Sequence, residues 1–144
     1  MWYESKARFE QLQEDGCNKM VTEAYMVDAL TFTEAEARTT EEVSQYVSGE
    51  LDVVAIKRTN IKEVCYNAGG EKWYNCKLVF ITLDEKSGKE KKSSYNILVQ
   101  ADSIDEGKKQ LVEHMRGSMQ DWELKSITET NIVDVYAHQN STNN

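Results

Sequence analysis

The sequence has no proline and very little histidine or cysteine. Its 144 residues include no proline, two histidines and three cysteines. The absence of proline suits long strands, because a proline removes a hydrogen-bond donor from a β-ladder. The cysteines, Cys17, Cys65 and Cys76, are odd in number and lack the spacing of a metal site. They therefore predict reduced thiols and a cytoplasmic protein.

Long apolar runs and basic stretches are also missing. No segment approaches the ~20 apolar residues that a membrane span needs. The start of the chain, Met1 to Lys6, lacks the basic and apolar regions of a signal peptide. The sequence therefore predicts no membrane association. The net charge of −8 disfavours a protein that coats duplex DNA by bulk electrostatics.

No catalytic or cofactor-binding motif is recognisable. The chain has no glycine-rich phosphate loop, dinucleotide fingerprint, nucleophile elbow or Cys/His pair. His114 falls in a predicted helix and His138 near the end of the chain, so neither belongs to a metal-binding set. The sequence predicts no catalytic residues, no cofactor and no metal. An enzyme that uses a carboxylate pair is a third hypothesis, and it would require a deep pocket with convergent polar groups.

What the sequence does contain is an internal repeat. The motif Trp-Tyr-x-x-Lys occurs at 2–6 and again 71 residues later at 73–77. Val-x-Ala occurs at 27–29 and at 99–101, a shift of 72, and Thr-Asn-Ile occurs at 59–61 and at 130–132, again a shift of 71. Three landmarks in one order at nearly one offset indicate two copies of a single supersecondary unit.

Each copy reads as strand, strand, helix, strand. Residues 2–12 alternate, with Tyr3, Ser5, Ala7 and Phe9 on one face, as a strand with one buried face requires. Asp15-Gly16 predicts a tight turn before a strand over 20–28. A helix follows, capped by Thr31 or Thr33 and ended by Ser48-Gly49. Its apolar stripe is predicted to be Phe32, Ala35, Thr39, Val43 and Val47.

A third strand is predicted over 52–66, with a bulge near Asn60. The second copy gives strands over 73–83, 92–100 and 121–136, and a helix that Ser103 caps and Gly117 ends. The prediction is an α+β fold made of a duplicated β-β-α-β unit with pseudo-two-fold symmetry. Its six strands form a mostly antiparallel sheet, or two abutting sheets, with two helices on one face. The repeats span 1–66 and 71–136 and pack as one globular domain, and 137–144 form a flexible tail.

The candidate binding feature is the Trp-x-x-x-Lys pair in each copy. Alternation places Trp2 with Lys6, and Trp73 with Lys77, on the face opposite the Tyr3/Phe9 type of face. If the helices cover the other face, an open face with aromatics and cations is typical of a platform for unpaired bases. Arg8, Lys91 and Lys92 extend it. The candidate partner-binding residues are Trp2, Lys6, Arg8, Trp73, Lys77, Lys91 and Lys92.

The same face is also apolar, since Val79, Ile81 and Leu83 share it with Trp73. The tryptophans are then core residues, or anchors for a protein partner or for a second copy of the chain. The leading hypothesis is a non-enzymatic intracellular binding or assembly module that uses a sheet face or edge against a protein partner or itself. The alternative is single-stranded nucleic-acid binding through the Trp/Lys face.

Several strings resemble one family. The chain resembles an uncharacterised domain-of-unknown-function family of small proteins from Bacteroides-type bacteria and their phages. The resemblance covers the chain up to about Tyr136 and implies a small bacterial or phage-borne cytoplasmic protein, with no activity to carry over. The strings that carry it are Trp2-Tyr-Glu-Ser-Lys6, Val21-Thr-Glu-Ala-Tyr25, residues 27–38, Ile56-Lys-Arg58, Lys72–Lys77, Phe80–Gly88 and Asp134-Val-Tyr136.

Overall fold

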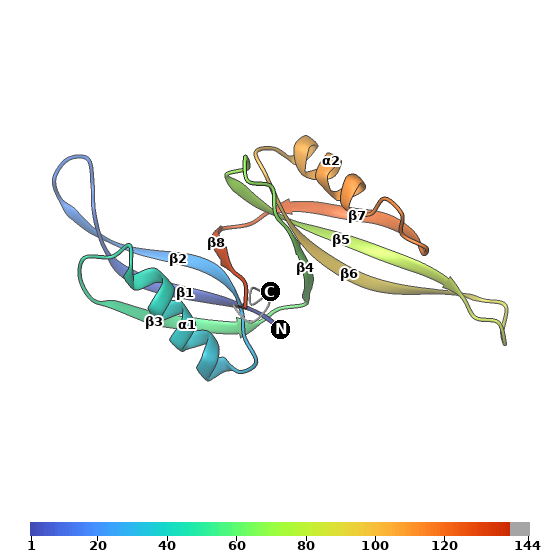
Figure 1. Ribbon diagram of the computed structural model, residues 1–144, viewed down its shortest axis with the longest axis horizontal. Coiled ribbons are helices and arrows are strands. Elements are labelled where there is room, and N and C mark those ends of the chain that lie inside the picture. Colours follow the sequence, from blue (N-terminus) through green and yellow to red (C-terminus); the bar gives the residue numbers. More distant parts are fainter. Residues whose placement is uncertain (139–144) are drawn as a thin grey trace, which may run out of the picture. The chain divides into compact units, whose positions relative to one another are not determined.

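The computed structural model describes residues 1–138, which form an α+β fold with two four-stranded mixed sheets (Figure 1). No helix within this range is long and apolar enough to cross a membrane. Within this range the elements are β1 (Trp2–Leu12), β2 (Asn18–Asp28), α1 (Phe32–Ser44), β3 (Leu51–Arg58), β4 (Ile61–Cys65), β5 (Lys72–Leu83), β6 (Glu90–Ala101), α2 (Ile104–His114), β7 (Asp121–Glu129) and β8 (Ile132–Tyr136).

The first sheet has the strand order β3-β1-β2-β8. β1 is antiparallel to both β2 and β3, whereas β8 is parallel to β2. Helix α1 covers one face of this sheet (Figure 1). The predicted alternation of β1 is confirmed, because its Tyr3, Ser5, Ala7 and Phe9 side chains are all buried. A polar contact joins helix and sheet, since Thr39 Oγ1 lies 2.8 Å from Ser5 Oγ.

The second sheet has the order β4-β6-β5-β7, with β4 parallel to β6 and the other pairs antiparallel. Helix α2 covers one face of it (Figure 1). Gly107 and Leu111 of α2, and Met115 directly after it, are buried there, whereas Ile104 is exposed. The core consists of Cys76, Leu78, Ile97, Val99, Leu111 and Met115.

The chain divides into two compact units, and it passes between them twice. Unit 1 contains Met1–Thr59 and the residues from Asn131 onward, and unit 2 contains Asn60–Thr130. The last strand of the chain, β8, thus pairs in the first sheet, and β4 pairs in the second. The sequence repeats, 1–66 and 71–136, have different boundaries from these units. Of the predicted tail over 137–144, residues 139–144 lie outside the described residues.

Two predictions about the strands are therefore wrong. The strand predicted over 52–66 is two strands in two different sheets, and so is the strand predicted over 121–136. The break occurs at Thr59 and at Thr130. Each threonine N–H and hydroxyl donates to the carbonyl of a tryptophan, Trp2 or Trp73, with hydroxyl distances of 2.8 Å. These bonds hold the end of the strand while the next two residues leave the sheet. The fold has eight strands over residues 1–138, rather than six.

The helix ends also differ in part from expectation. Thr31, rather than Thr33, caps α1, with extended backbone and a hydroxyl that accepts from Glu34 N. Ser103 caps α2 in the same way, as predicted. Helix α1 ends at Ser44 instead of Ser48-Gly49, and Val47 lies beyond the helix, although Ala35, Thr39 and Val43 are buried as the stripe predicts. Phe32 is exposed, because it lies in the first turn, at the end of the stripe.

All four edge strands carry a β-bulge. The register of each edge strand shifts by one residue against its neighbour, so one residue on the edge strand has no partner. The unpaired residues are Val54 in β3, Lys62 in β4, Lys125 in β7 and Val133 in β8. Bulges interrupt the regular row of hydrogen-bonding groups that a sheet edge would otherwise offer to another strand.

The strand pairing can be tested with two matched variants. Val135 in β8 lies opposite Met26 of β2, and Val64 in β4 lies opposite Leu98 of β6. We expect Val135→Ala to speed amide exchange in β2, because it removes buried methyl groups beside that strand. We expect Val64→Ala to speed exchange in β6 instead. Hydrogen exchange resolved by residue checks both variants, and the reverse pattern would show that each strand pairs within its own half of the sequence.

Candidate binding pocket

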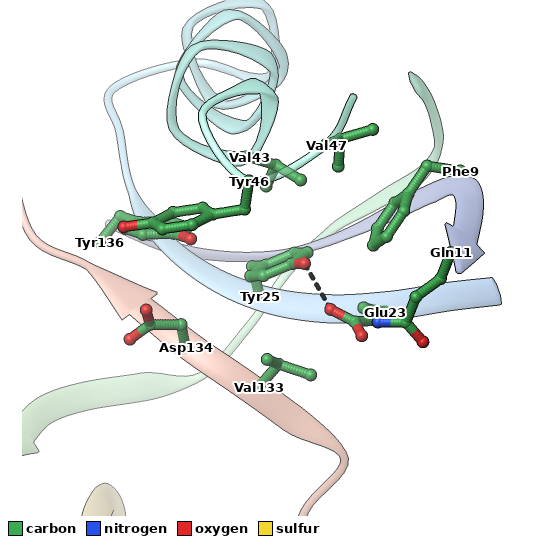
Figure 2. Close-up of a pocket in the computed structure, with 10 residues that line it drawn as sticks. All are labelled: Phe9, Gln11, Glu23, Tyr25, Val43, Tyr46, Val47, Val133, Asp134 and Tyr136. Atoms are coloured by element: carbon green, nitrogen blue, oxygen red, sulfur yellow. Dashed lines mark hydrogen bonds between the residues drawn. The ribbon is translucent and has the colours of Figure 1, made fainter. Parts of the chain in front are cut away.

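A pocket of about 300 Å³ lies in unit 1, beside the β2–β8 pair and below the end of α1 (Figure 2). We call it the tyrosine pocket, because three of its lining side chains are tyrosines. All its residues belong to unit 1. They are Phe9, Gln11, Glu23, Tyr25, Val43, Tyr46, Val47, Val133, Asp134 and Tyr136.

Strand periodicity and one bulge bring these side chains together. Glu23 and Tyr25 are two residues apart on β2, so both point to the face that α1 covers. Asp134 lies opposite Tyr25 in the β2–β8 register, and Tyr136 follows it on the same face. The bulge at Val133 sets this register. Tyr46 comes from the turn after α1, where its N–H donates to Val43 O.

Two of the aromatic side chains form a largely buried stack, and a third is exposed. The rings of Tyr25 and Tyr136 are stacked with centroids 5.7 Å apart and planes 23° from parallel. Tyr25 is only 4% exposed, whereas Tyr46 is 77% exposed at the rim. Figure 2 shows Tyr46 reaching down from the helix toward Tyr136. The pocket therefore offers a rigid aromatic floor and an accessible aromatic rim.

The hydroxyls of Tyr25 and Tyr136 have raised pKa values, so both are neutral at physiological pH. Tyr25 OH donates to Glu23 Oε2 at 2.7 Å (Figure 2). Burial raises the pKa of Tyr25 well above its usual range, and the hydrogen bond to Glu23 adds to the effect. Burial also raises the pKa of Tyr136, with a further contribution from the negative charge of Asp134. The negative charge of the pocket therefore comes from carboxylates alone.

These carboxylates have no cationic partner. Glu23 accepts from Tyr25, and Asp134 Oδ1 accepts from Val135 N at 2.8 Å. Among the described residues, no salt bridge reaches Glu23 or Asp134. Unit 1 as a whole is acidic, because its residues include 6 Lys/Arg against 13 Asp/Glu, whereas unit 2 has 11 against 12.

Unit 2 has a carboxylate on its own parallel edge strand, and this carboxylate has partners within the unit. Glu63 of β4 lies 71 positions before Asp134 and accepts from Tyr95 OH at 2.5 Å. His114 of α2 lies 3.0 Å from the other Glu63 oxygen. The hydrogen bond from Tyr95, more than the contact with His114, lowers the pKa of Glu63. Burial, with help from Glu63, raises the pKa of Tyr95 to about 12.

Three of the sequence-predicted site residues lie together on β1 of unit 1. Trp2, Lys6 and Arg8 alternate with the buried residues under α1, so they lie on the opposite face from the helix. Lys6 and Arg8 are exposed, and Trp2 is partly buried. Lys6 also lines a second hollow with Thr22, Glu23, Ala24, Asn131 and Val133. Glu23 and Val133 line the tyrosine pocket as well, so the two hollows adjoin.

The other four predicted residues belong to unit 2. Trp73 and Lys77 are on β5, and Lys92 lies opposite Ile81 of β5, which places it on their face, whereas Lys91 lies on the other face. The three lysines are exposed, but Trp73 is 3% exposed and its ring lies edge-on to Tyr66 at 5.8 Å. The pocket residues were not among the predicted sites, because only the pairing of β8 with β2 brings Asp134 and Tyr136 beside Tyr25.

The chain belongs to a family defined by a domain of unknown function, DUF4494, whose model matches residues 1–138. The resemblance to such a family is thus confirmed, and the matched range includes every described residue. No curated protein and no solved structure matches the chain.

The Glu63 cluster gives a pH prediction. We expect Tyr95→Phe to destabilise the protein by about 1 kcal/mol at neutral pH, because it removes the hydrogen bond to Glu63. The pKa of Glu63 is lowered in the folded state, so its contribution is present above the unfolded pKa and is lost as the pH falls through the folded pKa.

The destabilisation by Tyr95→Phe should therefore shrink at about pH 3, below the ordinary glutamate pKa. Urea unfolding of both proteins at neutral and acid pH measures this difference. A penalty that stays the same at both pH values would show that the ionised form of Glu63 does not contribute.

Proposed function

We propose that this protein is a non-enzymatic binding or assembly module that engages a protein partner, or a second copy of itself, through a sheet face rather than a sheet edge. The observation that carries the proposal is that every edge strand of the described sheets is bulged. A partner strand cannot extend such an edge in a regular ladder. Faces are then the surfaces on which to look for a site.

The face that best fits is the one with the tyrosine pocket in unit 1. Its rim presents Tyr46 and Val133, which are 77% and 51% exposed. Tyrosine is enriched at protein interfaces, because it combines a large apolar ring with a hydroxyl and loses little conformational entropy. Exposed aromatic groups around a pocket are what an anchoring side chain of a partner requires.

We further propose that the chain arose by duplication, with pseudo-symmetry between its halves. Corresponding positions support this. The bulged residues Val54 and Lys125 are 71 apart, and so are Lys62 and Val133. Both halves also use the same helix cap geometry. Duplication would explain why unit 2 holds a filled version of the site that is open in unit 1.

Binding of single-stranded nucleic acid through Trp2, Lys6, Trp73 and Lys77 is the alternative. The exposed Lys6, Arg8, Lys77 and Lys92 favour it, whereas the 3% exposure of Trp73 weighs against base stacking on that ring. If this alternative holds, an oligonucleotide quenches tryptophan fluorescence, high salt weakens the quenching, and Trp73→Ala abolishes it. Emission that ignores the oligonucleotide contradicts it.

The cytoplasm remains the proposed location, and three free thiols support it. A bacterial or phage source also remains a proposal.

Site-specific photo-cross-linking tests the binding proposal. A photoactivatable phenylalanine analogue replaces one of three exposed residues of unit 1: Tyr46 at the pocket rim, Arg8 on the opposite face, or Val54 on the β3 edge. We expect protein adducts, to another protein or to a second copy, from position 46 and none from position 54. Adducts from position 8 alone would move the site to the Trp2/Lys6 face. Adducts from position 54 alone, or from none, would refute face binding.

A further inference from the structure

We propose that the tyrosine pocket binds the guanidinium group of an arginine side chain that a partner protein presents. This inference rests on the proposed function, because it names what the pocket of a protein-binding module would take. Three features of the described residues support it: carboxylates without a salt bridge, an aromatic lining with one exposed ring, and the contrast with the Glu63 cluster of unit 2.

The first feature is charge. Glu23 and Asp134 come from neighbouring strands, and both line a pocket whose described lining has no basic residue. Neither forms a salt bridge among the described residues, although Lys6 lines an adjoining hollow with Glu23. Glu42, at the end of α1, forms an ion pair with Arg38 at 3.9 Å. Arg38 does not line the pocket. Carboxylates that line a half-enclosed aromatic site attract a cation more strongly than carboxylates in open water.

The second feature is the aromatic surface. A cation over the face of a tyrosine ring is attracted by the ring electrons, and a planar guanidinium also stacks on such a face. Tyr25 and Tyr136 provide a fixed stack, and Tyr46 an accessible ring beside it (Figure 2). A small, hard metal ion does not fit this lining, since it needs several oxygen ligands in its first shell.

The third feature is the contrast with unit 2. There, Glu63 already has a basic ring beside it, His114 at 3.0 Å, and a tyrosine hydroxyl. The position 72 residues before His114 is Glu42. Unit 1 thus has a carboxylate, Glu42, where unit 2 has the basic ring, and among the described residues no basic side chain forms an ion pair with Asp134. A basic group supplied by a partner would take this place.

Arginine fits better than the other organic cations. Its rigid fork donates to a carboxylate while its plane lies on an aromatic ring, whereas the ammonium of lysine is a compact point charge. Free arginine carries an α-ammonium and an α-carboxylate in addition to its guanidinium, so its main chain adds two charges that the pocket would have to accommodate. In a peptide, the main chain is neutral and the guanidinium is the only charge.

The test uses the full chain, labelled with ¹⁵N, and four probes, of which three have an uncharged backbone. They are acetyl-Gly-X-Gly-amide peptides, in which X is arginine, lysine or citrulline, together with free L-arginine. Citrulline is nearly isosteric with arginine but neutral. We expect saturable shifts of the amides of Val47, Val133 and Tyr136 with the arginine peptide. The citrulline peptide should bind at least about tenfold more weakly than the arginine peptide. Added salt should lower the affinity for the arginine peptide.

Two variants separate the pocket from general charge. Asp134→Asn removes one pocket carboxylate, and its oxygen can still accept from Val135 N. Glu50→Gln removes an equal charge from an exposed site of unit 1 outside the pocket. We expect Asp134→Asn to lower the affinity for the arginine peptide by about tenfold. Glu50→Gln should leave that affinity nearly unchanged. Tyr46→Ala, at an exposed position, should weaken binding without unfolding the chain.

Equal binding of the citrulline and arginine peptides would overturn the cation inference but leave the pocket as a protein-binding site. Tighter binding of the lysine peptide or of free arginine would overturn the choice of ligand. No saturable shift with any probe, or shifts confined to unit 2, would overturn the inference altogether. The photo-cross-linking result does not depend on these outcomes, so the broader binding proposal can stand or fall by itself.

Discussion

The structure depends on two parallel strand pairs, β8 with β2 in unit 1 and β4 with β6 in unit 2. β8 completes the sheet of unit 1, and β4 completes the sheet of unit 2. Because β8 is the last strand in the described chain, unit 1 cannot be complete until almost all of the sequence is available. Contacts between residues so far apart in sequence require a large loss of loop-closure entropy before they stabilise the fold.

The same pairing creates the pocket. Asp134 and Tyr136 reach Glu23 and Tyr25 only because β8 lies beside β2. Arg38 of α1 links the ends of β2 and β8, because its guanidinium donates to the carbonyl oxygens of Asp28 and Ala137. The position of Asp134 is thus held by backbone pairing on one side and by a charged side chain at the end of the strand. A rigid frame of this kind reduces the entropy that a ligand must overcome.

The two units surround a carboxylate on their parallel edge strand in different ways. A carboxylate on the parallel edge strand faces the same region of sheet and helix in each unit. In unit 2, Tyr95 and His114 satisfy it, and Phe80 packs edge-on against the Tyr95 ring. In unit 1, the tyrosines leave space, and the two pocket carboxylates form no salt bridge among the described residues. Side chains on corresponding strands therefore form a hydrogen-bonded cluster in one unit and line a pocket in the other.

The sequence determined the local features by itself. Alternation in residues 2–12, the threonine and serine helix caps and the buried stripe of α1 follow from interactions between residues a few positions apart, so a single sequence displays them. The sequence also shows the matched Thr-Asn-Ile segments. The broken alternation at Thr59-Asn60 predicts a bulge inside one strand, whereas the chain in fact changes sheets there.

Only the tertiary structure decided which sheet each short strand joins, because that choice depends on backbone pairing with strands far away in sequence. Ile61–Cys65 and Ile132–Tyr136 have the same strand-forming composition in either sheet. The tyrosine pocket follows from that choice, which is why Tyr25, Asp134 and Tyr136 could not be grouped from the sequence. Periodicity sets the face on which a side chain lies, but only strand pairing sets its neighbours.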